Sequence, residues 1–237
     1  MKSYNKYLPL LTFLLSHPRL AHLILQVRQQ HLTYLSITAL SELAEAVLRV
    51  ESLMPSGLLI ECGSALGGSA LVMAGAKFKN RALNLYDTFE MIPPPSENDE
   101  EDAWQRFRII QGGQATGVNG GIYYGYVPDL YQRVQQTFLN FGFSDRSNRI
   151  RFIRGLFEKT LIIDQPVALA HLDCDWYESV MTCLSSIEPH LLVGGILVID
   201  DYYDWAGCRK AVDEYFANSQ DKYRFIHRNR LQILKIQ

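Results

Sequence analysis

Two pairs of aspartates, each at the end of an apolar run, are the side chains of this chain best suited to chemistry. Asp173 and Asp175 close one run, and Asp200 and Asp201 close another. Continuous apolar runs are typical of buried parallel strands, and ligands of open α/β sheets bind beyond the carboxyl ends of the strands. Four carboxylates at one sheet edge would repel one another, and a divalent cation with oxygen ligands would relieve that repulsion. The two pairs therefore predict a metal site.

Simpler explanations compete for some of the neighbouring side chains. Aspartate is a favoured N-cap, so Asp175 or Asp204 could instead cap the helix that follows each strand. His171 lies two residues before Asp173 on the same strand face and is a candidate base, but a core histidine with satisfied hydrogen bonds is the commoner case. Cys174 has no evident basic partner, so we expect it to fill space rather than to act as a nucleophile.

From residue 33 onward, strand-like runs alternate with stretches of helical spacing. The expected strands are 58–62, 82–87, 150–153, 167–172, 195–199, 224–226 and 231–236. The expected helices are 38–50, 69–77, 128–141, 157–161, 177–191 and 208–217. This alternation predicts an α/β fold with a mainly parallel sheet, and the last two strands leave no room for a helix between them, which predicts a closing antiparallel hairpin.

Two segments do not follow that alternation, and they set the expected domain boundaries. Residues 1–32 are expected to be a helical extension, with one or two amphipathic helices over 4–30, and 33–237 the main domain. An insert at about 91–126 is too long for an ordinary connection. Its glycine-rich part, 112–126, ends in tyrosines and is expected to be a lid over the site or an arm to a neighbouring subunit, so we expect a homodimer or higher homo-oligomer.

The insert also contains an acidic run, 96–102, before a helical stretch near 103–110. Acidic side chains are favoured at a helix N-terminus. We therefore interpret the run as a solvated helix start.

Composition excludes several classes of partner. The formal net charge is -2, with Lys and Arg scattered along the chain, so no basic surface for nucleic acid is expected. The N-terminal apolar run is far below the roughly 20 residues needed to span a bilayer, so no membrane partner is expected. The four cysteines form no Cys-x-x-Cys pair, which indicates reduced thiols in a cytoplasmic protein without a zinc site.

A glycine turn after the first strand points to a nucleoside ligand. Gly63, Gly67 and Gly68 follow Glu61, a spacing that does not match the G-x-G-x-x-G fingerprint of dinucleotide sites. Asp87 at the end of the second strand could accept hydrogen bonds from both hydroxyls of a ribose. S-adenosylmethionine (SAM) fits these features because it has a ribose and an amino-acid tail but no phosphate.

Taken in order, these motifs resemble the macrocin O-methyltransferase family, which includes sugar O-methyltransferases of macrolide and aminocoumarin biosynthesis. The resemblance runs from about residue 33 to 216 and rests on the motifs Glu61-x-Gly63-x-x-x-Gly67-Gly68, Tyr86-Asp87-Thr88, Gly155-x-Phe157, Leu172-Asp173-x-Asp175-x-Tyr177-Glu178-Ser179 and Asp200-Asp201-Tyr202. It implies a class I SAM-dependent methyltransferase fold, which is Rossmann-like with seven strands. It also implies Mg²⁺-dependent methyl transfer to a hydroxyl of a small molecule, and oligomers.

The resemblance also implies roles for individual residues. Asp173, Asp200 and Asp201 correspond to metal ligands, and Asp173 also to the general base. The SAM site would comprise Glu61, Gly63, Ser64, Gly68, Ser69, Asp87, Thr88, Gly155, Phe157 and Asp173. Cys174 and Trp176 depart from the residues usual in the family, and with the unmatched segment 112–126 they leave the sugar acceptor open.

The chemistry favours the same assignment. A metal ion lowers the pKa of a bound hydroxyl, vicinal hydroxyls of a sugar or diol chelate Mg²⁺ well, and a nearby carboxylate accepts the proton. Aromatic residues are expected either to line the acceptor pocket or to pack in the core: Tyr123, Tyr124, Trp176, Tyr202, Tyr203 and Trp205. A metal-independent SAM methyltransferase and a non-catalytic SAM-fold binding protein remain the alternatives.

Overall fold

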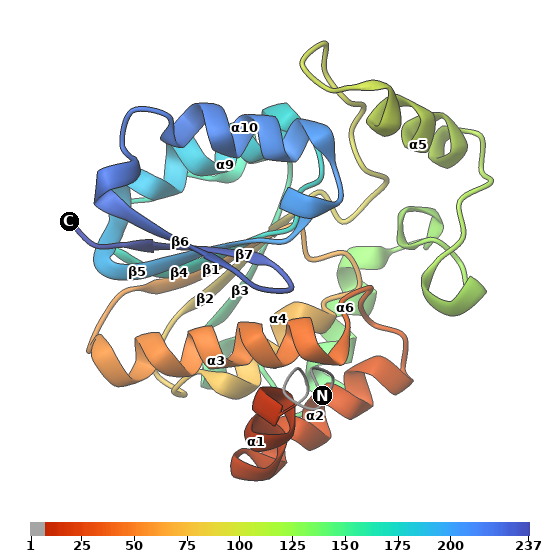
Figure 1. Ribbon diagram of the computed structural model, residues 1–237. Helices are drawn as coiled ribbons and strands as arrows, with labels where there is room; N and C mark the ends of the chain where they lie inside the picture. Colours follow the sequence, from red (N-terminus) through yellow and green to blue (C-terminus); the bar gives the residue numbers. More distant parts are fainter. Residues whose placement is uncertain (1–7) are drawn as a thin grey trace, which may run out of the picture.

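The computed structural model describes residues 8–237, and a single seven-stranded sheet forms its centre. The strands lie in the order β3-β2-β1-β4-β5-β7-β6 (Figure 1). Their bounds are β1 Leu58–Cys62, β2 Leu83–Asp87, β3 Ile150–Arg154, β4 Val167–Leu172, β5 Leu191–Ile199, β6 Tyr223–His227 and β7 Leu231–Lys235. The first five are parallel, and β7 pairs antiparallel with both β5 and β6. The expected mainly parallel sheet with a closing antiparallel hairpin is confirmed.

Two helical layers cover the sheet, as expected for strands buried on both faces. Figure 1 shows α9 and α10 on one face, and α3 and α4, with α1, α2 and α6 beyond them, on the other. The helices are α1 Leu8–Ser16, α2 Pro18–Gln29, α3 Ile37–Leu53, α4 Gly68–Ala76, α5 Glu101–Gln111, α6 Leu130–Asn140, α7 Asp145–Asn148, α8 Phe157–Thr160, α9 Tyr177–Ile187 and α10 Ala206–Phe216. Every residue of β1, β2 and β4 is buried, which explains why most of their side chains are apolar.

The N-terminal helices are part of the main hydrophobic core. Ile24 and Val27 of α2 are fully buried, as is Phe13 of α1 apart from 3% of its surface. The two expected helices are present, while residues 4–7 lie outside the described part of the chain. Over residues 8–237 no single helix is long and apolar enough to cross a membrane, although the bent pair formed by α1 and α2 meets the length and composition criteria jointly.

The insert is folded, and its acidic run does more than start a helix. Asp99 is buried, and its Oδ1 accepts a hydrogen bond from the backbone N–H of Tyr177, the first residue of α9, at 2.8 Å. Asp102 Oδ2 accepts from the N–H of Ala206, the first residue of α10, at 3.2 Å. The interpretation of 96–102 as a merely solvated helix start is therefore wrong for these two acids.

The same contacts correct the capping hypothesis. Neither α9 nor α10 has a side-chain cap from the residue that precedes it, so Asp175 and Asp204 do not act as caps. Asp175 instead adopts a left-handed backbone with φ 56°, and its carboxylate accepts a hydrogen bond from Trp205 Nε1 at 2.8 Å. The N-termini of both helices are satisfied from the insert, about 75 to 105 residues away in sequence.

Candidate active site

The turn after β1 brings two strand ends into contact. Gly63 has φ 85°, and a Cβ built there would lie 1.7 Å from the carbonyl oxygen of Asp173. Only glycine permits both the backbone conformation and this close approach. The turn after β1 is thereby held against the end of β4. Gly68 is equally constrained, because its Cβ would lie 2.4 Å from the carbonyl oxygen of Leu32, in the linker before α3.

Asp87, expected to bind a ribose, also holds the turn after β1. Its Oδ2 accepts from the backbone N–H groups of Ser64 and Ala65 at 2.6 and 2.9 Å, and its Oδ1 accepts from the N–H of Phe89 at 2.5 Å. Burial raises the pKa of this carboxyl, while the three backbone hydrogen bonds oppose the rise. A ligand hydroxyl that binds Asp87 would therefore share its carboxylate with the backbone N–H groups of the glycine turn.

A pocket opens beyond the carboxyl ends of β1, β2 and β4. It contains six of the residues expected at the SAM and metal sites: Gly63, Asp87, Thr88, Gly155, Phe157 and Asp173. The start of the insert contributes Ile92, Pro93 and Pro94, which the motifs did not indicate, and its tyrosine segment contributes Tyr124, one of the aromatic candidates for the acceptor pocket. Glu61, Ser64, Gly68 and Ser69 do not line this pocket; they lie buried beneath or beside the turn.

A buried row of polar groups crosses the sheet below the pocket. His171 of β4 is fully buried, with Nδ1 3.1 Å from Glu61 Oε1 on β1 and Nε2 3.3 Å from Asp200 Oδ1 after β5. Burial alone lowers the pKa of the imidazole, but the hydrogen bonds to Asp200 and Glu61 outweigh it and raise that pKa to about 10. His171 is thus a core histidine satisfied on both sides.

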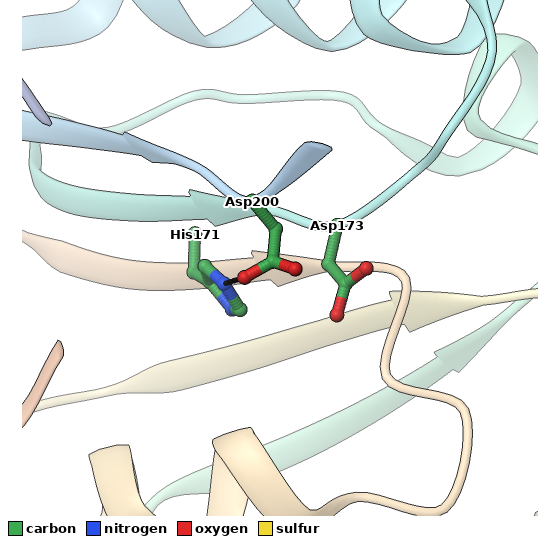
Figure 2. A group of neighbouring side chains, drawn as sticks. All are labelled: His171, Asp173 and Asp200. Carbon is green, nitrogen blue, oxygen red and sulfur yellow. Dashed lines mark hydrogen bonds and ion pairs between the residues drawn. The ribbon is translucent and has the colours of Figure 1, made fainter. Parts of the chain in front are cut away.

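His171 lies in one group with Asp173 and Asp200 that could hold a metal ion, although both of its ring nitrogens already face carboxylate oxygens. Ligand atoms of His171, Asp173 and Asp200 all lie within 4.8 Å of one another. Figure 2 shows the three side chains directed into one space from the ends of neighbouring strands. The sequence indicated Asp173 and Asp200 for this role, whereas His171 was considered only as a base or a core histidine.

Asp201, the third expected metal ligand, lies beside this group with a different partner. Its Oδ2 accepts a hydrogen bond from the backbone N–H of Asp175 at 3.1 Å. Its charge still acts on the cluster, since burial and then the charges of Asp200 and Asp201 raise the pKa of Asp173 well above its usual range. The pKa of Asp201 is raised similarly by burial and by the charges of Asp175 and Asp200. Asp200 has two cationic neighbours, because Arg230 Nε donates to its Oδ1 at 3.0 Å and the raised pKa of His171 favours the charged imidazole. Asp173, Asp175 and Asp201 have no cationic side chain within ion-pair distance among the described residues, which is the electrostatic setting of a cation site.

Two further observations fit a bound cofactor. Glu61 Oε2 and Ser64 Oγ are buried without a hydrogen-bond partner. Unpaired buried polar atoms are costly and call for an explanation such as a ligand or water. Both residues lie at the end of β1 or in the glycine turn that follows it.

The aromatic residues divide between pocket and packing. Tyr124 lines the pocket. Trp176 is buried and its Nε1 donates to the carbonyl oxygen of Pro93 at 2.9 Å, which fixes the start of the insert. Tyr202 and Tyr203 bond to Asp213 and His227 at 2.9 and 2.8 Å, so their hydroxyls are occupied outside the pocket. Cys174 is buried with its Sγ 3.9 Å from that of Cys183, in agreement with a space-filling role.

Comparison with known proteins identifies the relatives of this arrangement. Residues 29–226 match the family described as macrocin-O-methyltransferase (TylF). Demethyldecarbamoylnovobiocin O-methyltransferase of Streptomyces niveus is 28% identical over 192 residues, covering 78% of this chain and 68% of that protein. Mycinamicin III 3''-O-methyltransferase of Micromonospora griseorubida is 28% identical over 70% of this chain, which spans 64% of that protein's length.

Solved structures agree with the sequence relatives. The O-methyltransferase NovP superimposes with a TM-score of 0.71 at 26% identity, covering 87% of this chain and 83% of that one. The methyltransferase PaMTH1 of Podospora anserina, solved with S-adenosylhomocysteine (SAH), shares the fold with a TM-score of 0.55 at 15% identity, covering 92% of this chain and 88% of that one. The expected class I methyltransferase fold is confirmed. The chain belongs to the macrocin O-methyltransferase family and is a SAM-dependent O-methyltransferase.

Proposed function

We propose that this enzyme transfers the methyl group of SAM to a hydroxyl of a sugar or another diol-bearing natural product, and that the transfer depends on a divalent cation such as Mg²⁺. The observation that supports the metal most directly is the cluster of His171, Asp173 and Asp200 next to the Gly63 turn. Asp200 already pairs with Arg230 and His171, but Asp173 and the neighbouring Asp201 have no cationic partner among the described residues, and oxygen-rich sites of this kind suit Mg²⁺.

Different residues would contact the two ligands, SAM and the divalent cation. Gly63, Thr88, Gly155 and Phe157 would contact the adenosine part of SAM, because they line one continuous pocket beside Asp87. Glu61, Ser64, Gly68 and Ser69 would act from below this pocket, by fixing the turn or by bonding to the amino-acid tail. Asp173, Asp200 and Asp201 would hold the cation, with His171 orienting Asp200.

The proposed chemistry uses the position of Asp173 between pocket and cluster. A bound divalent cation would supply the positive charge that lowers the pKa of an acceptor hydroxyl. Asp173 lines the SAM pocket and belongs to the acidic cluster, so it is placed to accept the hydroxyl proton as the oxygen attacks the methyl group. Without a cation, burial and the charges of Asp200 and Asp201 raise the pKa of Asp173, and a bound cation would lower that pKa and keep the carboxylate ionised, as a base requires.

The acceptor class rests on the relatives. One relative is named for a reaction on a novobiocin precursor, a second for the 3'' position of mycinamicin III, and a third, from Streptomyces olivaceus, for the 4' position of a rhamnosyl-tetracenomycin. The third is 29% identical, and this chain spans 61% of its length. A glycosylated natural product with neighbouring hydroxyls is therefore the acceptor we propose.

We also propose that the insert covers the acceptor and that the enzyme is a homodimer or larger. Tyr124 and residues 92–94 already form one wall of the pocket, so a movement of the 112–126 segment would change access to it. Leu11, Leu15 and Leu25 on the N-terminal helices are between 44% and 74% exposed, and a second subunit would bury them.

Metal dependence can be tested without knowing the acceptor. Electron paramagnetic resonance of Mn²⁺ should show one tight site in the purified enzyme, weakened at least tenfold by Asp173→Asn or Asp200→Asn, since each removes a charged oxygen ligand. Asp213→Asn, which changes an exposed aspartate of α10, is the control and should leave Mn²⁺ binding unchanged. Absence of Mn²⁺ binding in the wild type, with SAH still bound in calorimetry, would leave only the metal-independent alternative.

A further inference from the structure

Five basic side chains from different segments gather at the amino ends of β2 and β3: Lys77, Arg81, Arg146, Arg149 and Arg151. One hollow there is lined by Asn84, Arg146, Arg149, Arg151 and Gln165. A second hollow shares Arg149 and Gln165 with the first and extends it to Arg81. The strand ends that bear Asp87 and Asp173 form the opposite edge of the sheet, so this surface is separate from the active site.

The topology explains why a hollow exists at this place. The connection from β3 to β4 contains only the four-residue helix α8, so no full helix covers the sheet face over β2 and β3. Asn84 of β2 and Arg151 of β3 are paired in register and lie on this face. Asn84 is 6% exposed, its amide nitrogen is 3.4 Å from the Tyr86 hydroxyl, and its amide oxygen has no partner. A polar ligand or water is the usual explanation for such an atom.

Positive charge at this edge exceeds the negative charge that faces it. Lys77 and Arg81 are 7% and 8% exposed, and the only acid within ion-pair distance of either among the described residues is Glu51, which bonds Arg81 Nε at 2.8 Å. Glu51 is further committed to the N–H of Phe78 at 3.0 Å. The pKa of Lys77 is lowered to about 8, mainly by burial. The charge of Glu51 opposes this change, and the charges of Arg149 and Arg81 add to it.

Two arginines of the first hollow, Arg149 and Arg151, have no acidic partner among the described ion pairs. Arg149 Nη1 donates to the carbonyl oxygen of Asn80 at 3.0 Å, and the side chains that the structure describes place no acid within ion-pair distance of Arg149 or Arg151. One acid, Asp164, acts in the same region, since its charge raises the pKa of Tyr86 while that of Arg151 lowers it. Arginine presents planar, paired donors that match the oxygens of a phosphate group.

We propose that the hollow lined by Asn84, Arg149 and Arg151 is a binding site for the phosphate group of a small phosphorylated ligand. The converging guanidinium groups supply the charge, and the uncovered sheet face supplies a polar floor. The sequence predicted no basic surface for nucleic acid, and these basic residues belong to different segments: the residue after α4, the loop before β2, α7 and the start of β3. Folding brings them together.

The test uses pyrophosphate as the probe and calorimetry on the full chain, with sodium chloride added to match ionic strength. Wild type should bind pyrophosphate saturably at one site, and Arg149→Gln/Arg151→Gln should weaken binding about tenfold through the loss of charge-assisted hydrogen bonds. Arg224→Gln is the matched control, because Arg224 is an exposed arginine on the opposite edge strand, β6, and it should bind like wild type.

Three outcomes would overturn the site. They are an absence of saturable binding at matched ionic strength, a loss below threefold in the double variant, and an equal loss in the Arg224→Gln control. Arg151→Gln alone keeps the test decisive if the double variant is unstable, because Arg151 is exposed and donates to no backbone carbonyl among the described contacts. SAH affinity should be unchanged in every variant, which separates this result from any failure of the proposed methyl transfer.

Discussion

Replacing Asp99 by alanine should destabilise the whole domain, although Asp99 lies in an insert that looks peripheral in sequence. The carboxylate accepts three hydrogen bonds: from the N–H of Tyr177 at 2.8 Å, and from the N–H and hydroxyl of Ser96 at 2.9 and 3.0 Å. Loss of a helix cap costs about 1–2 kcal/mol. Loss of the buried turn around Ser96 adds about 1 kcal/mol, the usual net value of a hydrogen bond.

The expected loss in the free energy of unfolding is therefore about 2–3 kcal/mol, which lowers the Tm by about 5–10 °C for a chain of this size. Urea denaturation followed by circular dichroism measures the first quantity, and calorimetry the second. Asp99→Asn should lose less, because an amide oxygen still accepts from Tyr177 while the amide nitrogen cannot accept from Ser96.

Glu97→Ala is the control, since Glu97 is exposed two residues away in the same segment and should stay within about 0.5 kcal/mol of wild type. Hydrogen exchange should show faster exchange of the first amides of α9 in Asp99→Ala and not in Glu97→Ala. An unfolding free energy of Asp99→Ala equal to that of Glu97→Ala would refute the reasoning that the insert caps α9.

Three further perturbations follow from buried groups. Arg81→Met should cost about 3–5 kcal/mol in urea denaturation, because it leaves the buried Glu51 carboxylate without its cation; a loss below 1 kcal/mol would contradict this. Asp87→Asn should weaken SAH binding in calorimetry by about tenfold or more, because the N–H groups of Ser64 and Ala65 lose a charged acceptor and the turn loosens; unchanged affinity would show that the turn holds without it. Because the folded-state pKa of Lys77 is about 8, below the unfolded value of about 10.4, the unfolded chain binds more protons between these values. Wild type should therefore gain stability relative to Lys77→Met as pH rises from 8 to 10, and parallel pH profiles would argue against a depressed pKa.

Much of the sheet could be predicted from sequence because its strands are buried on both faces and appear as plain apolar runs. The start of β5 was less clear. The expected strand began at Gly195, whereas the strand begins at Leu191, because partly exposed residues interrupt the apolar run before Gly195. The expected helix 177–191 was correspondingly too long, because Pro189 lies in a separate short turn after α9 ends at Ile187. Local composition indicates well which segments are buried, but it indicates poorly where a half-exposed strand begins.

The site shows the same division between local and long-range information. Asp173 and Asp200 were predictable because each follows its own strand, and parallel strands end at one edge. The partners of Glu61 and Asp87 were not predictable, since they depend on pairing across 22 to 110 residues. The capping roles of Asp99 and Asp102 were also missed in the sequence, because a cap is usually sought in the residue just before its helix and these two acids lie far away along the chain.

The order of strands in the sheet has a consequence for synthesis of the chain on the ribosome. Leu58 of β1 pairs with Val167 of β4, 109 residues later in the sequence, and β1 is buried on both faces. At translation rates of about 5–20 residues per second, this separation corresponds to about 5–20 s. During that interval each nascent chain has β1 open along the edge that β4 will later occupy, with apolar side chains and unpaired backbone groups exposed. Contact with chaperones, or with neighbouring nascent chains, should therefore be concentrated in the period before residue 172 has left the ribosome, and slow codons in the stretch 91–166 would prolong it.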